Sequence, residues 1–61
     1  MSVPAPAQVY ELLARQGPLA AVHIARRLDA PPIAIEGLLR GLSMAGRVRR
    51  TGRALHLWEA R

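Results

Sequence analysis

Residues 31–51 read PPIAIEGLLRGLSMAGRVRRT, and the spacing of the apolar residues changes within this stretch. Up to Gly46, large apolar residues recur every three or four positions, as on one face of an α-helix. They are Ile35, Leu38, Leu39 and Leu42. Pro32 suits the first position of this helix, and Gly46 suits its C-terminal cap. Residues 47–51 then follow the two-residue period of a strand, so the stretch predicts a helix followed directly by a strand.

Two shorter helices are predicted upstream. The first begins at Pro6 and is stopped by Gly17-Pro18, and Leu19 lies in a short extended link. The second ends at the turn of residues 29–32, where Asp29 and two prolines lie. The apolar stripes of these helices are Val9, Leu12 and Leu13 in the first and Ala21, Ile24, Ala25 and Leu28 in the second.

The chain is predicted to end in a β-hairpin. Its strands are residues 47–51 and 54–59, joined by a tight turn at Gly52-Arg53. In the return strand we expect Leu55 and Leu57 to face the core, and His56 and Trp58 to face outwards. Trp58, the one tryptophan of the chain, would lean onto the third helix and be half-buried there.

The order helix, link, helix, turn, helix, hairpin is that of a winged helix, an α+β fold with a helix-turn-helix inside it. We therefore predict one domain over residues 6–61, preceded by a flexible tail over residues 1–5. At 61 residues the chain has one modest core and little room for a deep catalytic cleft.

Composition narrows the classes of function. The chain has no cysteine, which excludes disulfides, iron–sulfur clusters and thiolate zinc sites. His23 and His56 lie far apart without further ligands, and the hydroxyl residues have no evident base beside them. We therefore expect no metal, no cofactor and no enzymatic activity. The first six residues lack the pattern of a signal peptide, and no apolar run is long enough to span a bilayer, so a cytoplasmic protein is expected.

The net charge is +5, and all nine basic residues are arginines. Four of them fall within the predicted hairpin: Arg47, Arg49, Arg50 and Arg53. The planar guanidinium group binds phosphate or carboxylate groups, so this basic wing is a candidate contact for nucleic acid or an acidic partner. Alternatively, it is a solvated edge that prevents strand pairing.

The exposed face of the third helix is the second candidate site. In a helix that reads DNA this face carries base-contacting side chains. Here Glu36 and Arg40 are its only long polar residues, and they are spaced to pair with each other. Gly37 and Gly41 weaken the helix, so their presence needs an explanation. The alternatives are a partner that approaches the backbone closely, a lack of room for a side chain beside the domain's own hairpin or first helix, and a helix that simply tolerates the two glycines. The predicted partner-binding set is Ile33, Glu36, Gly37, Arg40, Gly41, Met44 and Trp58.

The chain resembles the FeoC family over nearly its whole length. The resemblance lies in residues 8–14 (QVYELLA), Gly17, residues 21–24 (AVHI), residues 28–31 (LDAP), Ile35, Leu38, Leu39, Leu42, residues 43–47 (SMAGR), Trp58 and Arg61. FeoC proteins are small cytosolic winged-helix accessories of bacterial ferrous iron transport. The resemblance implies contact with the cytosolic G-protein domain of the transporter FeoB. Many members have a cysteine-rich wing proposed to bind an iron–sulfur cluster; this wing has no cysteine, so the chain would act by protein contact alone.

Residues 35–58 are also similar to Z-nucleic-acid-binding winged helices and to the tail domain of DNA-processing protein A. Of the residues typical of Z-form recognition only Trp58 matches, because Glu36, Arg40, Leu55 and His56 stand where that family has Asn, Tyr and two prolines. Two alternatives to the FeoC-like function therefore stay open. One is a DNA-binding regulator or architectural module that grips phosphate with the wing. The other is an assembly element that dimerises through the Gly37 and Gly41 face.

Overall fold

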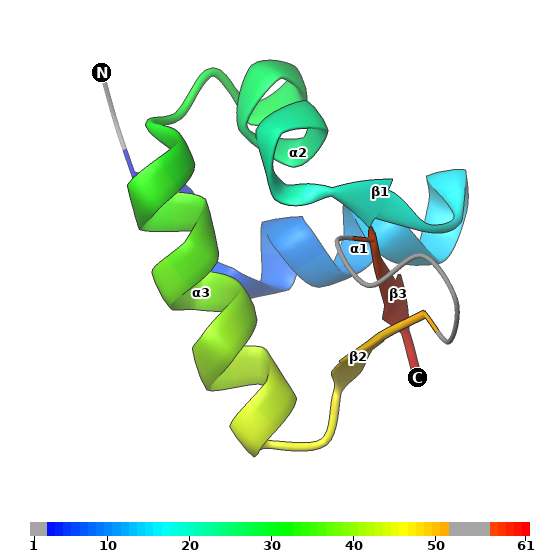
Figure 1. Cartoon of the computed structure of the whole chain (residues 1–61). Helices are drawn as coiled ribbons and strands as arrows, with labels where there is room; N and C mark the ends of the chain where they lie inside the picture. Colours follow the sequence, from blue (N-terminus) through cyan, green and yellow to red (C-terminus); the bar gives the residue numbers. More distant parts are fainter. Residues whose placement is uncertain (1–2, 52–56) are drawn as a thin grey trace.

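Three helices precede an antiparallel hairpin in the computed structural model, which describes residues 3–51 and 57–61 (Figure 1). The elements in chain order are α1 (Pro6–Gln16), β1 (Leu19–Ala20), α2 (Ala21–Leu28), α3 (Pro32–Met44), β2 (Val48–Arg50) and β3 (Leu57–Ala60). This is the predicted α+β architecture of a winged helix. The helix bounds agree with the prediction, including the starts at Pro6 and Pro32.

The sheet has one strand more than the predicted hairpin. Its order is β1-β3-β2, with both pairings antiparallel. The extended link before α2 forms β1, in which Leu19 lies opposite Trp58 and Ala20 opposite Leu57. A strand of two residues is too short to show an alternation of apolar and polar residues in the sequence. Its partner strand lies far along the chain, so only the tertiary fold creates this strand.

The hairpin strands differ in detail from the prediction. The first strand was predicted over residues 47–51 and covers Val48–Arg50. The described part of the return strand is Leu57–Ala60, one residue beyond the predicted end at residue 59. The predicted turn at Gly52-Arg53 lies outside the described residues. In the predicted tail, residues 3–5 are irregular, but Pro4 is buried.

Gly46 ends α3 as predicted. The amide of Arg47 donates to the carbonyl of Leu42 (2.9 Å), and the amide of Gly46 donates to Ser43 (3.0 Å). These two bonds form the Schellman motif, which satisfies carbonyls that the helix leaves free. The motif requires a left-handed residue, and Gly46 has a φ of 74°. Gly46 thereby turns the chain from α3 directly into β2.

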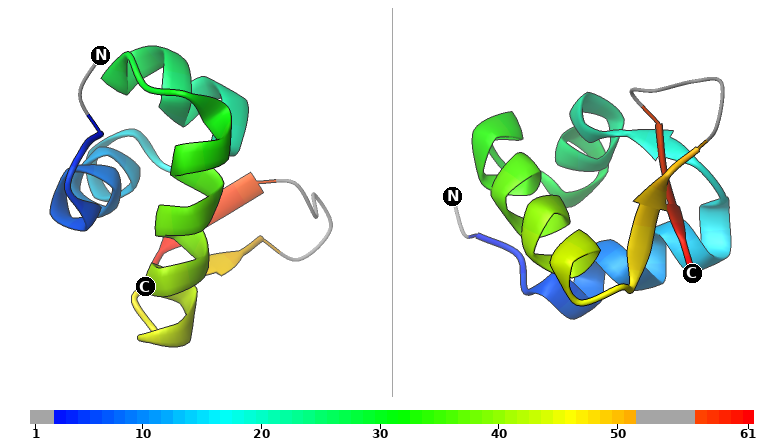
Figure 2. Two further views of the ribbon diagram at one scale, coloured as in Figure 1. Left: turned by 90° about the vertical axis from the view of Figure 1, so that its left-hand side faces the viewer. Right: turned by 60° about the horizontal axis from the view of Figure 1, so that its bottom comes forward.

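The core is built from the predicted apolar stripes and one strand residue. The largest fully buried side chains are Val9 and Leu13 of α1, Ile24 of α2, Ile35 and Leu39 of α3, and Val48 of β2. Figure 2 (left) shows α3 crossing the front of the molecule, between α1 on one side and the hairpin on the other. The buried face of α3 therefore packs against α1, α2 and the sheet.

The predicted orientation of β3 is wrong. Trp58 and Ala60 pack against the core, whereas Leu57 was predicted to do so. Because side chains alternate along a strand, Leu57 and Glu59 belong to the opposite face. Pairing with both β1 and β2 fixes this register, and the wide indole covers more of the core than a leucine would. Leu55 and His56 lie outside the described residues.

The left-handed turn after α3 generates a stability prediction. We expect Gly46→Ala to lower the free energy of unfolding by about 1 kcal/mol, because a Cβ disfavours positive φ. Gly41→Ala, inside the same helix, is the control and should raise it by about 1 kcal/mol. Urea denaturation followed by circular dichroism measures both. Equal effects of the two substitutions would contradict the assigned turn.

Candidate functional site

The solvent side of α3 has two exposed apolar side chains with two glycines between them. Ile33 is 79% exposed and Met44 is 86% exposed, and Gly37 and Gly41 are exposed between them. A helix turns by about 100° per residue, which places these four residues on one side of it. We call Ile33, Gly37, Gly41 and Met44 the outer face. It lies opposite the buried residues Ile35, Leu39 and Leu42.

The two glycines of the outer face have open space around them. A Cβ built on Gly37 or on Gly41 would meet no described atom within 4 Å. Both lie inside α3 in helical conformation, where each costs about 1 kcal/mol relative to alanine. Crowding against α1 or the described strands of the hairpin, one of the explanations left open, is therefore wrong. The fold itself gives no reason for either glycine.

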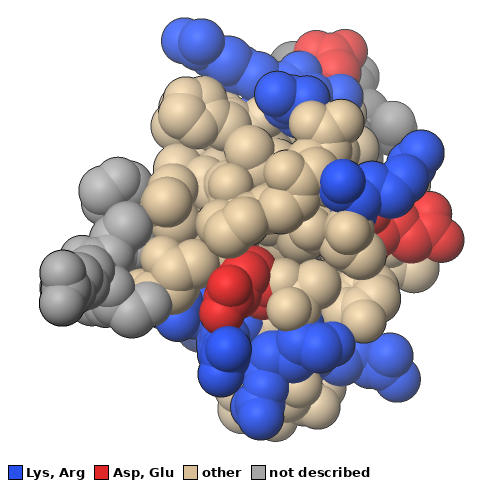
Figure 3. Space-filling model, turned by 90° about the vertical axis from the view of Figure 1, so that its right-hand side faces the viewer, with Lys and Arg blue, Asp and Glu red and all other residues tan. Residues whose placement is uncertain are grey.

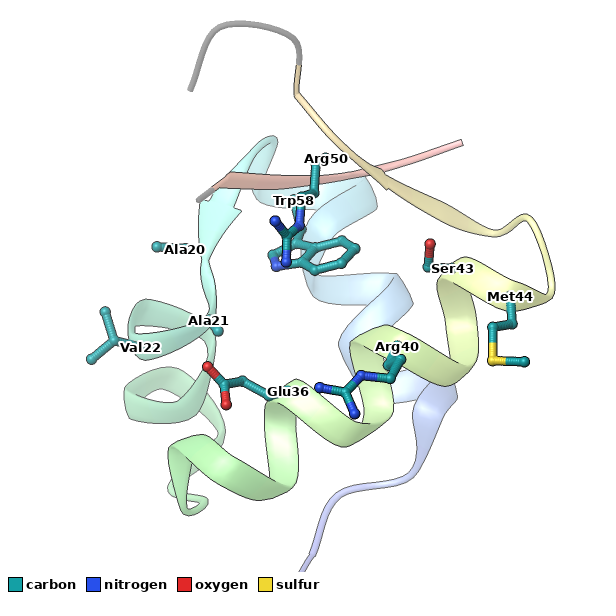
Figure 4. Close-up of a pocket in the computed structure, with 9 residues that line it drawn as sticks. All are labelled: Ala20, Ala21, Val22, Glu36, Arg40, Ser43, Met44, Arg50 and Trp58. Carbon is teal, nitrogen blue, oxygen red and sulfur yellow. The ribbon is translucent and has the colours of Figure 1, made fainter. Parts of the chain in front are cut away.

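A groove runs between α3, the start of α2 and the sheet. Its volume is about 690 Å³. Its lining residues are Ala20, Ala21, Val22, Glu36, Arg40, Ser43, Met44, Arg50 and Trp58. In Figure 4, Glu36 and Arg40 rise from α3 on one side, and Arg50 and Trp58 extend from the sheet on the other. The groove adjoins the outer face, and Met44 belongs to both.

Trp58 forms the sheet wall of the groove. It is half-buried, as predicted, and packs against the core. The guanidinium carbon of Arg50 lies 5.0 Å from the centre of the indole. This distance is that of a cation–π contact, worth about 0.5–1 kcal/mol at exposed sites. Arg50 is consequently held against the groove wall.

The predicted basic wing is divided by the structure. Arg49 points to the other face of β2 from Arg50 and pairs with Glu59 at 2.7 Å. Arg47 lies beside the start of α1, in a second hollow that Tyr10 also lines. Arg53 lies outside the described residues. Figure 3 shows arginines at the top, right and bottom of one face of the molecule, with a mostly uncharged area and one acidic side chain between them.

Glu36 and Arg40 both line the groove, yet they form no ion pair in the described part of the chain. The expectation that they pair with each other is therefore not met. The structure brings four of the seven predicted partner-binding residues onto the groove: Glu36, Arg40, Met44 and Trp58 line it, and Gly37 belongs to the outer face. Ile33 and Gly41 complete the outer face.

Sequence reasoning missed the contribution of β1 and the start of α2 to the groove. Ala20, Ala21 and Val22 line the groove, and Val22 is 47% exposed. Val22 lies outside the apolar stripe of its helix, and this is the signal that marks it as exposed. Ser43 also lines the groove, and the sequence gives no signal that selects it. Its position at the groove depends on the rotation of α3 about its axis relative to the sheet.

Neither a metal cluster nor a membrane span is found in residues 3–51 and 57–61. No three His, Cys, Asp or Glu side chains gather there, and no helix is long and apolar enough to cross a bilayer. Comparison with family models, curated proteins and solved structures found no match to the chain. The resemblance to FeoC therefore stays a prediction, as do the absence of a cofactor and of enzymatic activity.

The Arg50–Trp58 contact generates a spectroscopic prediction. We expect Arg50→Gln to change the emission of Trp58, because it removes the cation from the face of the indole. Arg49→Gln removes the same charge from the opposite face of the strand and should leave the emission unchanged. Fluorescence spectra of the folded proteins measure both. Identical spectra for the wild type and Arg50→Gln would contradict the contact.

Proposed function

We propose that the chain is a winged-helix accessory protein that acts by docking onto a protein partner through the outer face of α3. One observation carries the proposal. Gly37 and Gly41 lie on an exposed helix face, between two exposed apolar side chains, with open space above them. Helix glycines that the fold does not need are accounted for by a partner that approaches the backbone closely.

The shape of the outer face suits a packed helix or strand of the partner. The separation of two packed helices depends on the side chains between them, so glycines let the partner come close. Ile33 and Met44 then supply apolar contacts at the two ends. Apolar residues and methionine are typical of the buried centre of a protein interface, where charged residues are scarce.

Base reading is supported less well by the same face. A helix in the major groove needs donors and acceptors such as Arg, Asn or Gln along it. Of the exposed residues on this side of α3 only Arg40 is of that kind, and Glu36 beside it would repel phosphate. The architecture is that of many DNA readers, but the residues favour a protein partner.

The partner we propose is the cytosolic G-protein domain of FeoB, because the chain resembles FeoC proteins. In this proposal the protein works in the cytoplasm of a bacterium as an accessory of ferrous iron transport. It regulates by contact and without an iron–sulfur cluster, since the chain has no cysteine to hold one. It has no catalytic role.

We expect the chain to bind the isolated cytosolic domain of FeoB in at least one nucleotide state. Gly37→Gln and Gly41→Gln should each weaken this binding at least tenfold, because the new side chain separates the two backbones. Both variants should fold at least as stably as the wild type, since glutamine is the better helix former. Calorimetric titration without nucleotide, with GDP and with a GTP analogue measures the affinity.

Ala14→Gln is the matched control for this experiment. It adds the same side chain to an exposed position of α1 and should leave the affinity unchanged. Absence of binding in all three nucleotide states would contradict FeoB as the partner. Binding that survives both glycine variants would contradict the outer face as the docking site.

Duplex DNA is the second candidate, because Arg40 and Arg50 line the groove beside α3 and no carboxylate of residues 3–51 and 57–61 is bound to either. This function predicts binding that weakens steeply with salt, with a slope near −0.9 for each phosphate neutralised. It also predicts shifts of the hairpin amides on adding duplex at low salt, measured by NMR. Unshifted amides would exclude it.

A further inference from the structure

The groove between α3 and the sheet holds two arginines from different elements. Arg40 comes from α3 and Arg50 from β2. Both are exposed, and neither forms an ion pair among the described residues. Arg49, the neighbour of Arg50, is by contrast paired with Glu59. The groove therefore keeps its positive charge, while the opposite face of the strand loses it.

Arg50 is arranged for binding an anion. The cation–π contact places its guanidinium carbon 5.0 Å from the centre of the Trp58 indole. A guanidinium group has five N–H donors, more than this contact occupies, so donors stay available for a carboxylate. The contact also restricts the side chain before a ligand arrives, which lowers the entropic cost of binding. An arginine restrained in this way favours a planar, bidentate acceptor.

The rest of the lining is apolar at the rim. Val22 is 47% exposed and Met44 is 86% exposed. Figure 4 shows them at opposite ends of the groove, with Arg40 between them and Trp58 above. A ligand that reaches the arginines would thus pass apolar side chains on either side. A chain segment with one acidic residue and apolar neighbours matches this arrangement.

Glu36 limits how much negative charge the groove accepts. Together with Arg40 and Arg50 it leaves a net charge of +1, two arginines less one glutamate, among the lining residues. In Figure 4 its carboxylate lies beside Ala21, away from Arg50. The net charge of +1 in the groove neutralises one carboxylate near Arg50. A row of phosphates along the groove would be repelled by the carboxylate of Glu36. The charges therefore favour a protein segment over a nucleic acid.

We propose that this groove binds an acidic residue of the docked partner, held by Arg40 and Arg50, with an apolar neighbour of that residue against Trp58 and Met44. This inference rests on the proposed function, in which the adjacent outer face of α3 contacts a protein. It adds the chemistry that the partner must offer beside that contact. It also assigns Arg50 a role that Arg49 lacks.

The test uses the intact chain and two dye-labelled peptides. One is acetylated and amidated Ala-Leu-Glu-Leu-Ala, and the other has Gln in place of its Glu. Fluorescence anisotropy at one low, fixed salt concentration measures their affinities. We expect the Glu peptide to bind about tenfold more tightly than the Gln peptide, because a charge-assisted hydrogen bond is lost in the latter. The NMR signal of the single indole N–H, that of Trp58, should shift on binding.

Four variants locate the binding. Arg40→Gln and Arg50→Gln should each weaken binding of the Glu peptide about tenfold. Arg49→Gln, which removes the same charge one residue away, should leave it unchanged. Glu36→Gln removes the opposing charge and should strengthen it several-fold. A cationic ligand would instead bind more weakly to Glu36→Gln and more tightly to the two arginine variants. The direction of the Glu36→Gln effect therefore distinguishes an acidic ligand from a cationic one.

Several results would overturn the inference. Equal affinities of the two peptides would do so, as would no binding of either. Equal losses for Arg49→Gln and Arg50→Gln would indicate attraction by net charge, and stronger binding of a 12-base-pair duplex in competition would indicate nucleic acid. These outcomes are separable from failure of the proposed function. If the glycine variants abolish binding of the FeoB domain while the peptides do not bind, the docking face stands and the groove ligand is refuted.

Discussion

The burial of Ile35 and Leu39 is the interaction on which the rest of this structure depends. Both side chains are completely buried, and they face the core residues of α1, α2 and β2. A domain of this size has one core, so no second cluster can hold α3 if this contact is lost. The contact fixes the rotation of α3 about its axis. Every residue on the other sides of the helix takes its position from that rotation.

Two candidate surfaces follow from this one rotation. With Leu39 inside, Gly37 and Gly41 face solvent, and Glu36 and Arg40 turn towards the sheet. The outer face and the groove are therefore neighbours on a single rigid helix. A partner on the outer face would lie within reach of the groove. The proposed docking contact and the proposed acidic contact would then be parts of one interface.

Strand alternation sorts the arginines in the same way. Val48 is buried, so Arg50, two residues on, lies on the same face of β2, while Arg49 lies on the other. The first therefore stacks on Trp58, and the second pairs with Glu59. In sequence the two look equivalent. Their different surroundings are what make one a candidate ligand contact and the other a matched control.

The sequence by itself determined the three helices, their ends and the α+β class. These depend on local rules: the 3.6-residue period of the apolar stripes, proline at a first position, and a left-handed glycine after α3. It also identified Gly37 and Gly41 as residues that a simple core does not explain. Only the tertiary structure decided the third strand, the face that β3 turns inward, and the α2 wall of the groove. These depend on pairing between segments far apart in the chain, and a two-residue strand or a half-buried tryptophan has no local pattern that reveals its partner.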